Sequence, residues 1–466
     1  MVQFENSLWK KIVSQSSSKA DSNGNIPVSS RLMRDQPHSF SNCTTTQKSD
    51  GRVCKYELLI LACYSYSYHN MQQPLSLNQK RIDSIDVLRG IAMILMALDH
   101  SRDYIHLATD DPLNLATTTP FLFFTRWVTH FCAPIFVFLS GTSIYLQSLR
   151  KTKKELSAFV IKRGLWLIFA EVAINTLFWT FNPFYNFINI QVLWAIGISM
   201  VILGLLIRLP FKFILILGIL IVFGHNLLDI PESAKDFKPG VLWTILHKGG
   251  GYFYAKNYFV LILYPFVPWT GLMLLGYCTG IFFSPAYTEA ARRKIFLRTG
   301  LGLLAFFILI RFINVYGNPE PWGTQKNWLF TILSFIDIHK YPPSLIYMCV
   351  TIGFAFLFLA LIERIKNGFT DTVRVFGRTA FFYYLLHVFL IHAVAGVLFF
   401  TRGHNMHDAM NAMYQNPFLF IVQGEGYGLP VVYAVWIGVL VILYPLCKWY
   451  DKYKTNHKEK WWLSYL

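Results

Sequence analysis

Residues 81–106, RIDSIDVLRGIAMILMALDHSRDYIH, decide how the rest of the chain is interpreted. The stretch opens with alternating charged and apolar residues and then has no polar side chain from Gly90 to Leu98. It ends in a cluster of ionisable residues, Asp99, His100, Arg102, Asp103 and His106. Ionisable groups are costly in lipid and persist mainly where they pair with each other or face a cavity. We therefore interpret this stretch as a helix that forms one wall of a functional site.

Helical geometry divides the polar cluster between two directions. Asp99, Arg102, Asp103 and His106 are spaced i, i+3, i+4 and i+7, which places them on one face, and His100 lies about 100° round from Asp99. Asp103 is the carboxylate expected to hold the ring of His100. An ion-pair network of Arg102 with Asp99 or Asp103 is the alternative, purely structural interpretation of the same residues.

The composition is that of a polytopic membrane protein. Of the 466 residues, 54% are hydrophobic and only 14% are charged, against about 25% charged in ordinary globular proteins. Only helices and closed barrels satisfy the backbone in lipid, and the apolar runs are too long for barrel strands. We predict an all-α transmembrane bundle of about ten spans, near 86–106, 120–148, 159–181, 190–207, 212–229, 259–282, 297–314, 344–363, 380–400 and 430–449.

The net charge of +17 reflects membrane orientation and not nucleic-acid binding. Basic residues gather in the connections after spans 2, 4, 6 and 8 and in the C-terminal tail, while the connections after spans 3 and 9 have almost none. By the positive-inside rule, both termini are expected in the cytoplasm, and the polar end of the first span faces away from it. No nucleic-acid partner is expected.

The chain divides into three parts. Residues 1–80 are polar and lack periodicity, which predicts a disordered or weakly ordered cytoplasmic tail, and Met71 is an alternative start. Residues 81–450 form the predicted membrane domain, and 451–466 a cytoplasmic tail. The seven cysteines contain no CxxC, and the first two spans contain no HxxxH or HxH. We therefore expect no disulfide framework and no metal.

The candidate site joins the first two spans. Arg126 and His130 lie at i and i+4 on the second span, so His130 and His100 are expected to share a cavity in the outer half of the membrane. A histidine beside carboxylates is typical of general-base catalysis. The catalytic candidates are therefore His100, Asp99, Asp103, His130 and His106. The substrate-binding candidates are Arg102, Arg126, Glu171 and Trp269. Glu171 has a second interpretation, as a tie between helices.

Basic residues at the inner ends of the helices suit a phosphorylated cofactor that arrives from the cytoplasm. They are Arg89, Lys162, Arg163 and Arg378. For any single one of them, a positive-inside residue with no ligand is the favoured explanation.

Four motifs in order resemble the heparan-alpha-glucosaminide N-acetyltransferase-like family. They are SIDVLRG at 84–90, HFCAPIFVFLSGTSIYL at 130–146, YPFVPWTGLMLLGYCTG at 264–280 and GRTAFFYYLLHVFLIH at 377–392, the last two looking closest to bacterial members. The resemblance implies a multi-pass acyltransferase of the bacterial inner membrane. It would take acetyl-CoA or another acyl-CoA from the cytoplasm and acylate an amino sugar or glycan on the far side, using a histidine in the outward half.

The chain departs from the family at the catalytic histidine. The lysosomal members have Asn at the position of His100, and their catalytic His follows eleven residues later, where this chain has Asp111. We therefore rank His100 first as the base, His130 second and His106 third. A transporter or flippase for a glycan or lipid is the alternative function, because intramembrane charges also suit transport. The sequence leaves homo-oligomerisation open.

Overall fold

The computed structural model describes residues 82–107, 111–413, 416–422 and 424–464. The predicted tail of residues 1–80, with the alternative start at Met71, lies outside the described residues. Cys132, Cys278, Cys349 and Cys447 lie within them, and all four are buried free thiols.

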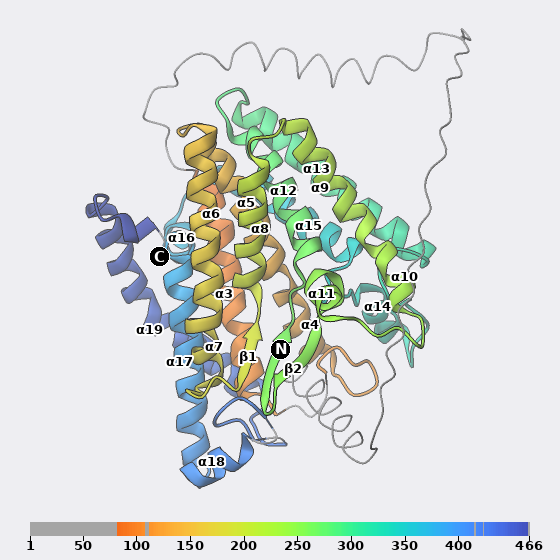
Figure 1. Cartoon of the computed structure of the whole chain (residues 1–466), viewed down its shortest axis with the longest axis vertical. Helices are drawn as coiled ribbons and strands as arrows, with labels where there is room; N and C mark the ends of the chain where they lie inside the picture. The colour runs from red at the N-terminus through yellow and green to blue at the C-terminus, as the bar shows by residue number, and fades with distance from the viewer. Residues whose placement is uncertain (1–81, 108–110, 414–415, 423, 465–466) are drawn as a thin grey trace, which may run out of the picture. The chain divides into compact units, whose positions relative to one another are not determined.

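Helices account for most of the described chain (Figure 1). The long helical segments are α3 (Asp83–Ile105), α4 (Pro120–Trp127) with η1 (Val128–Phe131) and α5 (Cys132–Ser148), α6 (Lys153–Ala170) with η2 (Glu171–Asn175) and α7 (Thr176–Thr180), α8 (Val192–Leu206), α9 (Phe211–Gly224) with η3 (His225–Leu228) and α10 (Asp229–Glu232), α12 (Phe266–Thr279) with η5 (Gly280–Phe283), α13 (Glu289–Ile313), α15 (Leu345–Ile362), α17 (Ala380–Thr401) and α19 (Leu429–Asn456).

Shorter elements fill the connections. They are β1 (Phe187–Ile190), α11 (Val241–Trp243), η4 (Thr244–Lys248), β2 (Gly250–Ala255), β3 (Tyr258–Ile262), α14 (Trp328–Ile336), α16 (Gly368–Arg378), α18 (Met406–Ala412) and η6 (Trp461–Ser464).

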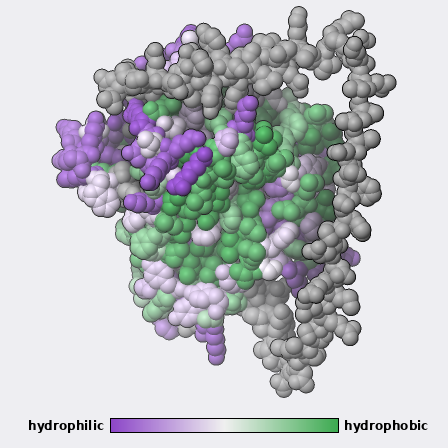
Figure 2. Space-filling view, turned by 45° about the horizontal axis from the view of Figure 1, so that its top comes forward, coloured by the Kyte–Doolittle hydropathy of each residue, from purple (hydrophilic) through white to green (hydrophobic). Residues whose placement is uncertain are grey.

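Every predicted span overlaps a helical segment, and seven of the described segments are long and apolar enough to cross a membrane. The other three are α3, which ends in its charged cluster, the segment from α6 to α7, and the shorter α8. The protein is therefore a helical membrane protein, and the total of ten crossings stays a prediction. Figure 2 shows a broad apolar area on one face, as expected for a surface in contact with lipid.

A small sheet departs from the all-helical prediction. β3 pairs in parallel with β1, with Phe187 opposite Phe259, and antiparallel with β2, with Gly250 opposite Ile262. The predicted start of a span at residue 259 is therefore wrong, because α12 begins only at Phe266. The segment YFVLI is rich in aromatic and branched residues that favour strands, and Pro265 directly precedes the helix.

Helix α3 packs against α5, α16, α17 and α19, so its polar end is enclosed by the bundle. Two glycines permit the closest of these approaches. A Cβ atom added at Gly90 would lie 2.0 Å from the carbonyl oxygen of Val373, and one at Gly377 would lie 1.8 Å from that of Asp86. Because these obstacles are backbone atoms, α3 and α16 meet at a separation that a larger residue would not allow.

The second span is interrupted just before Pro134, as expected for a proline within a helix. Residues Val128–Phe131 form a tighter helical turn between α4 and α5. Proline has no N–H to donate to the carbonyl four residues earlier, which belongs to His130. That carbonyl instead accepts a hydrogen bond from the hydroxyl of Tyr347, at 2.8 Å. The kink thus joins the second span to α15 beside the candidate site.

The third span contains a wide π-helical turn, Glu171–Asn175, of a kind often found at functional sites. Within it, Asn175 Nδ2 donates to Glu171 Oε1 at 2.6 Å, and the backbone N–H of Trp194 donates to Glu171 Oε2 at 3.0 Å. Both Glu171 and Asn175 are fully buried. The turn therefore places a carboxylate inside the bundle and fastens it to α8.

Candidate active site

Asp99 is the centre of a buried ion-pair network. Arg126 Nη1 donates to both of its carboxylate oxygens, at 2.9 and 2.8 Å, and Arg102 Nη2 lies 2.8 Å from Oδ1. The hydroxyl of Thr129 also donates to Asp99, at 2.8 Å. A buried carboxylate that is paired with two guanidinium groups is held firmly as an anion. The network ties α3 to the start of the second span.

Asp103 belongs to the same network. Its Oδ1 lies 2.5 Å from Arg102 Nη2, and both side chains are buried. In the structure this oxygen is directed to the guanidinium of Arg102, and the hydrogen bond to the ring of His100 comes from another residue. Arg102 Nε and Nη1 are buried and form no hydrogen bond with the described residues.

His100 is held by a second histidine from α17. His387 Nδ1 lies 2.9 Å from the carbonyl oxygen of Tyr383, and His387 Nε2 lies 2.9 Å from His100 Nδ1. A carbonyl only accepts, so His387 Nδ1 must carry the proton, and in a neutral ring Nε2 is then an acceptor. His100 consequently donates through Nδ1–H, which leaves its Nε2 with a free lone pair. Among the described residues, His100 Nε2 has no hydrogen-bond partner.

Aromatic side chains enclose the two histidines. The His100 ring lies edge-on to Trp179, with centroids 4.7 Å apart, and 6.3 Å from the ring of Tyr384. The Tyr384 hydroxyl in turn accepts from Asn175 Nδ2 at 3.2 Å, which links it to Glu171. The π-helical turn and the His100–His387 pair are thus neighbours inside one buried polar cluster.

The rings of His130 and Trp269 both lie near that of Tyr347. The His130 ring packs edge-on against Tyr347, with centroids 5.7 Å apart, and both of its ring nitrogens are buried without a partner in the described chain. Trp269 is fully buried, and its ring lies 6.5 Å from that of Tyr347. Arg126 and Thr129, which precede His130 in the chain, both donate to Asp99, which precedes His100, and in the described chain the two histidine rings do not contact each other.

His106 follows the last residue of α3 and pairs with the loop that precedes α19. It forms a parallel bridge with Tyr427, and the N–H of Tyr427 donates to the carbonyl of Ile105 at 2.8 Å. The same loop reaches α17, because Leu419 O lies 2.7 Å from His392 Nε2. The segments 416–422 and 424–428 thus cover the C-terminal end of α3, where His106 lies.

A cavity of about 580 Å³ lies between α3, α5, α6, α8, α16 and α17. Its rim is basic and its interior is apolar. The basic residues are Arg89, Arg150, Arg163, Arg378 and Lys454, and the apolar ones include Met93, Met96, Phe136, Leu193, Ile196 and Met200. The interior reaches Tyr384, the residue whose ring faces His100. A long molecule with an anionic head and a reactive tail would fit this arrangement.

Three of the four basic residues predicted to bind a cofactor line this cavity. Arg89 is fixed there by Asp86 at 3.1 Å and by Ser143 at 3.0 Å, and Arg378 is paired with Asp451 at 3.0 Å. Lys162 is exposed on α6 and is not among the residues that line the cavity. Arg150 and Lys454 also line the cavity, although the sequence analysis did not single them out as cofactor-binding candidates.

The fold and the site together define a membrane-embedded protein with a buried acid–base cluster above a basic-rimmed cavity. The family model for heparan-alpha-glucosaminide N-acetyltransferase, catalytic, matches residues 81–315, half of the chain, and the chain therefore belongs to this family. The match confirms the resemblance of the first three motifs, whereas α15, α16, α17 and α19 lie beyond it. No curated protein matches the chain.

Proposed function

We propose that the chain is an acyl-CoA-dependent acyltransferase. In this proposal it moves an acetyl or other acyl group from cytoplasmic acyl-CoA to an amino sugar or glycan on the other side of the membrane. Membership of the acetyltransferase family supports a transferase activity. The donor, the acceptor and the side on which each binds are the proposed parts.

The observation that carries the proposal is a cavity with basic residues in its lining that reaches Tyr384, whose ring lies 6.3 Å from that of His100. Arg89, Arg163 and Arg378 would hold the phosphates of CoA, because guanidinium groups bind phosphate through charge-assisted hydrogen bonds. The pantetheine arm would follow the apolar interior to Tyr384. In this proposal the thioester would then lie near Tyr384 and the His100–His387 pair.

The reaction follows from the tautomer of His100. Its free Nε2 takes a proton from the amine or hydroxyl of the acceptor, and the acceptor forms a new bond to the thioester carbonyl carbon. As the C–S bond breaks, the CoA thiolate takes the proton from the His100 imidazolium. The products are an amide or ester and free CoA, so the transfer needs no oxidant and no metal. His387 stabilises the imidazolium by accepting from its Nδ1–H.

The outer half of the cluster would receive the acceptor. Arg102 has two buried nitrogen positions without partners in the described chain, which suits the hydroxyl groups of a sugar. Asp99 and Arg126 would position Arg102 and would not contact the reacting atoms. His106 and the loop that contacts it lie where an acceptor would enter from outside.

The donor site is tested by a pair of neighbouring residues on α6. Arg163 lines the cavity and Lys162 does not, so the two substitutions differ in the proposed contact but remove the same charge. A charge-assisted hydrogen bond contributes about 1.5–3 kcal/mol, so Arg163→Ala should weaken the binding of CoA by about tenfold or more. Lys162→Ala should leave it unchanged. Isothermal titration of the purified protein with CoA in detergent measures both.

Two results would overturn this proposal. If Arg163→Ala and Lys162→Ala have the same CoA affinity as the wild type, the cavity is not the donor site. If the protein in liposomes moves a glycan or lipid across the membrane without transferring an acyl group, it is a transporter or flippase instead.

A further inference from the structure

We propose that Asp229, Glu232 and His247 bind a divalent metal ion, of which zinc is the best match. The site lies away from the His100 cluster and does not depend on the proposed acyl transfer. The sequence analysis expected no metal because the first two spans have no HxxxH or HxH spacing. This group draws its ligands from two separate segments, α10 and η4, so spacing within a helix does not reveal it.

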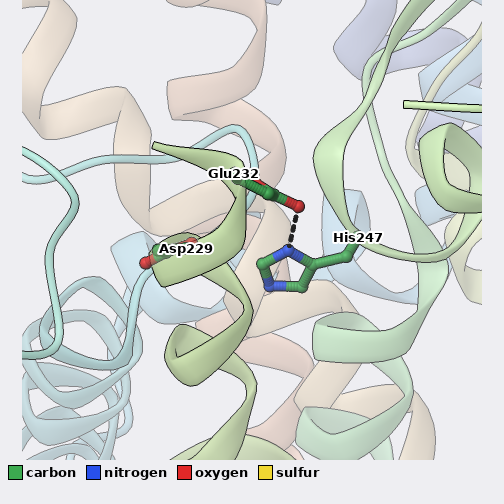
Figure 3. A group of neighbouring side chains, drawn as sticks. All are labelled: Asp229, Glu232 and His247. Atoms are coloured by element: carbon green, nitrogen blue, oxygen red, sulfur yellow. Dashed lines mark hydrogen bonds and ion pairs between the residues drawn. The ribbon is translucent and has the colours of Figure 1, made fainter. Parts of the chain in front are cut away.

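The three side chains lie close together. Each offers a ligand atom, and these atoms lie within 4.8 Å of one another. Asp229 and Glu232 are three residues apart on α10, and Figure 3 shows the carboxylate of Glu232 and the ring of His247 pointing toward each other. Glu232 Oε1 lies 2.8 Å from His247 Nδ1. Ligands on a tetrahedral zinc are about 3.3 Å apart for bonds of about 2.0–2.1 Å, so small side-chain rotations would admit the ion.

The chemistry of the ligands selects the ion. One imidazole and two carboxylates match zinc, whereas calcium and magnesium prefer oxygen ligands alone. Three protein ligands on zinc leave a fourth position for water. Glu232 and His247 are almost completely buried, which shields the ion from bulk solvent.

A second histidine provides the partner that a metal-bound imidazole needs. Ligating histidines almost always donate their other ring N–H to an acceptor, which fixes the ring. His247 Nε2 lies 3.2 Å from His225 Nδ1. His225 is buried, with only 3% of its surface exposed. Its Nε2 has no hydrogen-bond partner among the described residues. With the ion on His247 Nδ1, the Nε2–H would donate to His225.

The carboxylates are held in place by their own donors. Trp243 Nε1 donates to Glu232 Oε1 at 2.6 Å, and Asn226 Nδ2 donates to Asp229 Oδ2 at 2.7 Å. One cation is already present, because Lys248 Nζ lies 3.3 Å from Glu232 Oε2, and its side chain is 40% exposed. Lysine is flexible and can swing into solvent when the ion binds. The two carboxylates then face the ion with their charge uncompensated.

Metal binding would fasten the connection after α9 to the segment before β2. Asn226, which holds Asp229, also accepts the N–H of Leu345 at 2.8 Å, so the start of α15 joins the same junction. The ion would therefore stabilise the junction of three segments in addition to occupying a coordination site.

The test measures metal content and thermal stability in the full-length protein. The chain is purified in detergent, stripped with chelator, incubated with zinc and desalted, and its zinc is then measured by mass spectrometry. The wild type should retain about one equivalent per chain and should melt at a higher temperature with zinc than without it. His247→Ala and Asp229→Asn should both lose the bound zinc and the thermal shift. Cobalt in place of zinc gives an absorption band that reports on the ligands directly.

A matched control separates this site from chance binding. His404 also lies between two carboxylates, Glu425 at 2.8 Å and Asp408 at 3.9 Å, but its group is more exposed. His404→Ala should retain the zinc. Asp229→Asn keeps a similar shape, so its melting temperature without zinc shows whether it still folds. Retention of zinc by both site variants would mean an adventitious ion only, and a wild type that binds less than stoichiometric zinc would also overturn the proposal.

Discussion

Replacement of His387 by phenylalanine tests the tautomer argument on which the catalytic proposal depends. Phenylalanine preserves the ring that lies parallel to His100, with centroids 4.9 Å apart, and to Tyr383, also 4.9 Å apart. It removes the nitrogen that accepts from His100 Nδ1 at 2.9 Å. The variant should therefore fold and bind the donor, but it should transfer the acyl group slowly.

The size of the loss follows from the missing hydrogen bond. A buried donor without a partner costs about 1–3 kcal/mol, and every 1.36 kcal/mol in the barrier is tenfold in rate, which gives a loss of about 5-fold to about 160-fold. The loss falls on kcat, because the lost hydrogen bond is strongest when His100 carries the extra proton. The KM for acyl-CoA should change little, since His387 does not line the cavity.

The assay follows transfer of a labelled acetyl group from acetyl-CoA to glucosamine-terminated acceptors by the purified protein. Tyr383→Phe is the matched control, because the Tyr383 hydroxyl is buried and has no partner in the described chain, while its backbone carbonyl still orients His387. Tyr383→Phe should retain normal kcat. If His387→Phe is as active as Tyr383→Phe, His387 does not set the tautomer of His100.

Three further predictions concern packing, pH and orientation. Gly377→Ala should lower stability by about 1–3 kcal/mol or prevent folding, because its Cβ would lie 1.8 Å from the backbone oxygen of Asp86. The temperature at which the protein aggregates in detergent measures this loss. Gly302→Ala is the control, because a Cβ at Gly302 would meet no atom within 4 Å. Burial, together with Glu320 and Asp111, raises the pKa of Asp337 from its usual value of 3.8 to about 7, against the opposing effect of Arg311. The folded state therefore keeps a proton that the unfolded state loses, so the stability that this carboxyl contributes should fall as pH rises from about 4 to about 7. Asp337→Asn should flatten that part of the curve of melting temperature against pH, and an unchanged slope would contradict the assignment. A reporter fused after Leu466 should be active only in the cytoplasm, and an external signal would reverse the predicted orientation.

Periodicity and hydropathy predict the helices of this protein well, because a long apolar run in lipid must satisfy its own backbone hydrogen bonds, which a helix does. The start of α12 is the instructive exception. Residues 258–262 continue the apolar run of the predicted span, yet they form strand β3. Hydropathy does not distinguish a buried strand from the first turns of a helix, and the partner strands β1 and β2 are not visible in the local pattern.

The polar end of α3 shows what helical spacing does and does not determine. The spacing places Asp99, Arg102 and Asp103 on one face, where they form the ion-pair network that the sequence analysis gave as an alternative. It also turns His100 away from Asp99. The partner of His100 then comes from α17, 287 residues later, and a lone histidine in an apolar helix carries no local sign of that role. The metal group was missed for the same reason, since its ligands lie on two segments.

The measurement that tests the central claim most directly is the kcat of His100→Ala for acetyl transfer from acetyl-CoA to a verified acceptor. CoA binding by the same variant is measured in parallel to show that the cavity is intact. General-base catalysis contributes about 10²–10⁴-fold, so kcat should fall by that order while the affinity for CoA stays within error of the wild type. Near-normal transfer by His100→Ala would contradict the account and would move the base to His130, to His106 or away from this cluster.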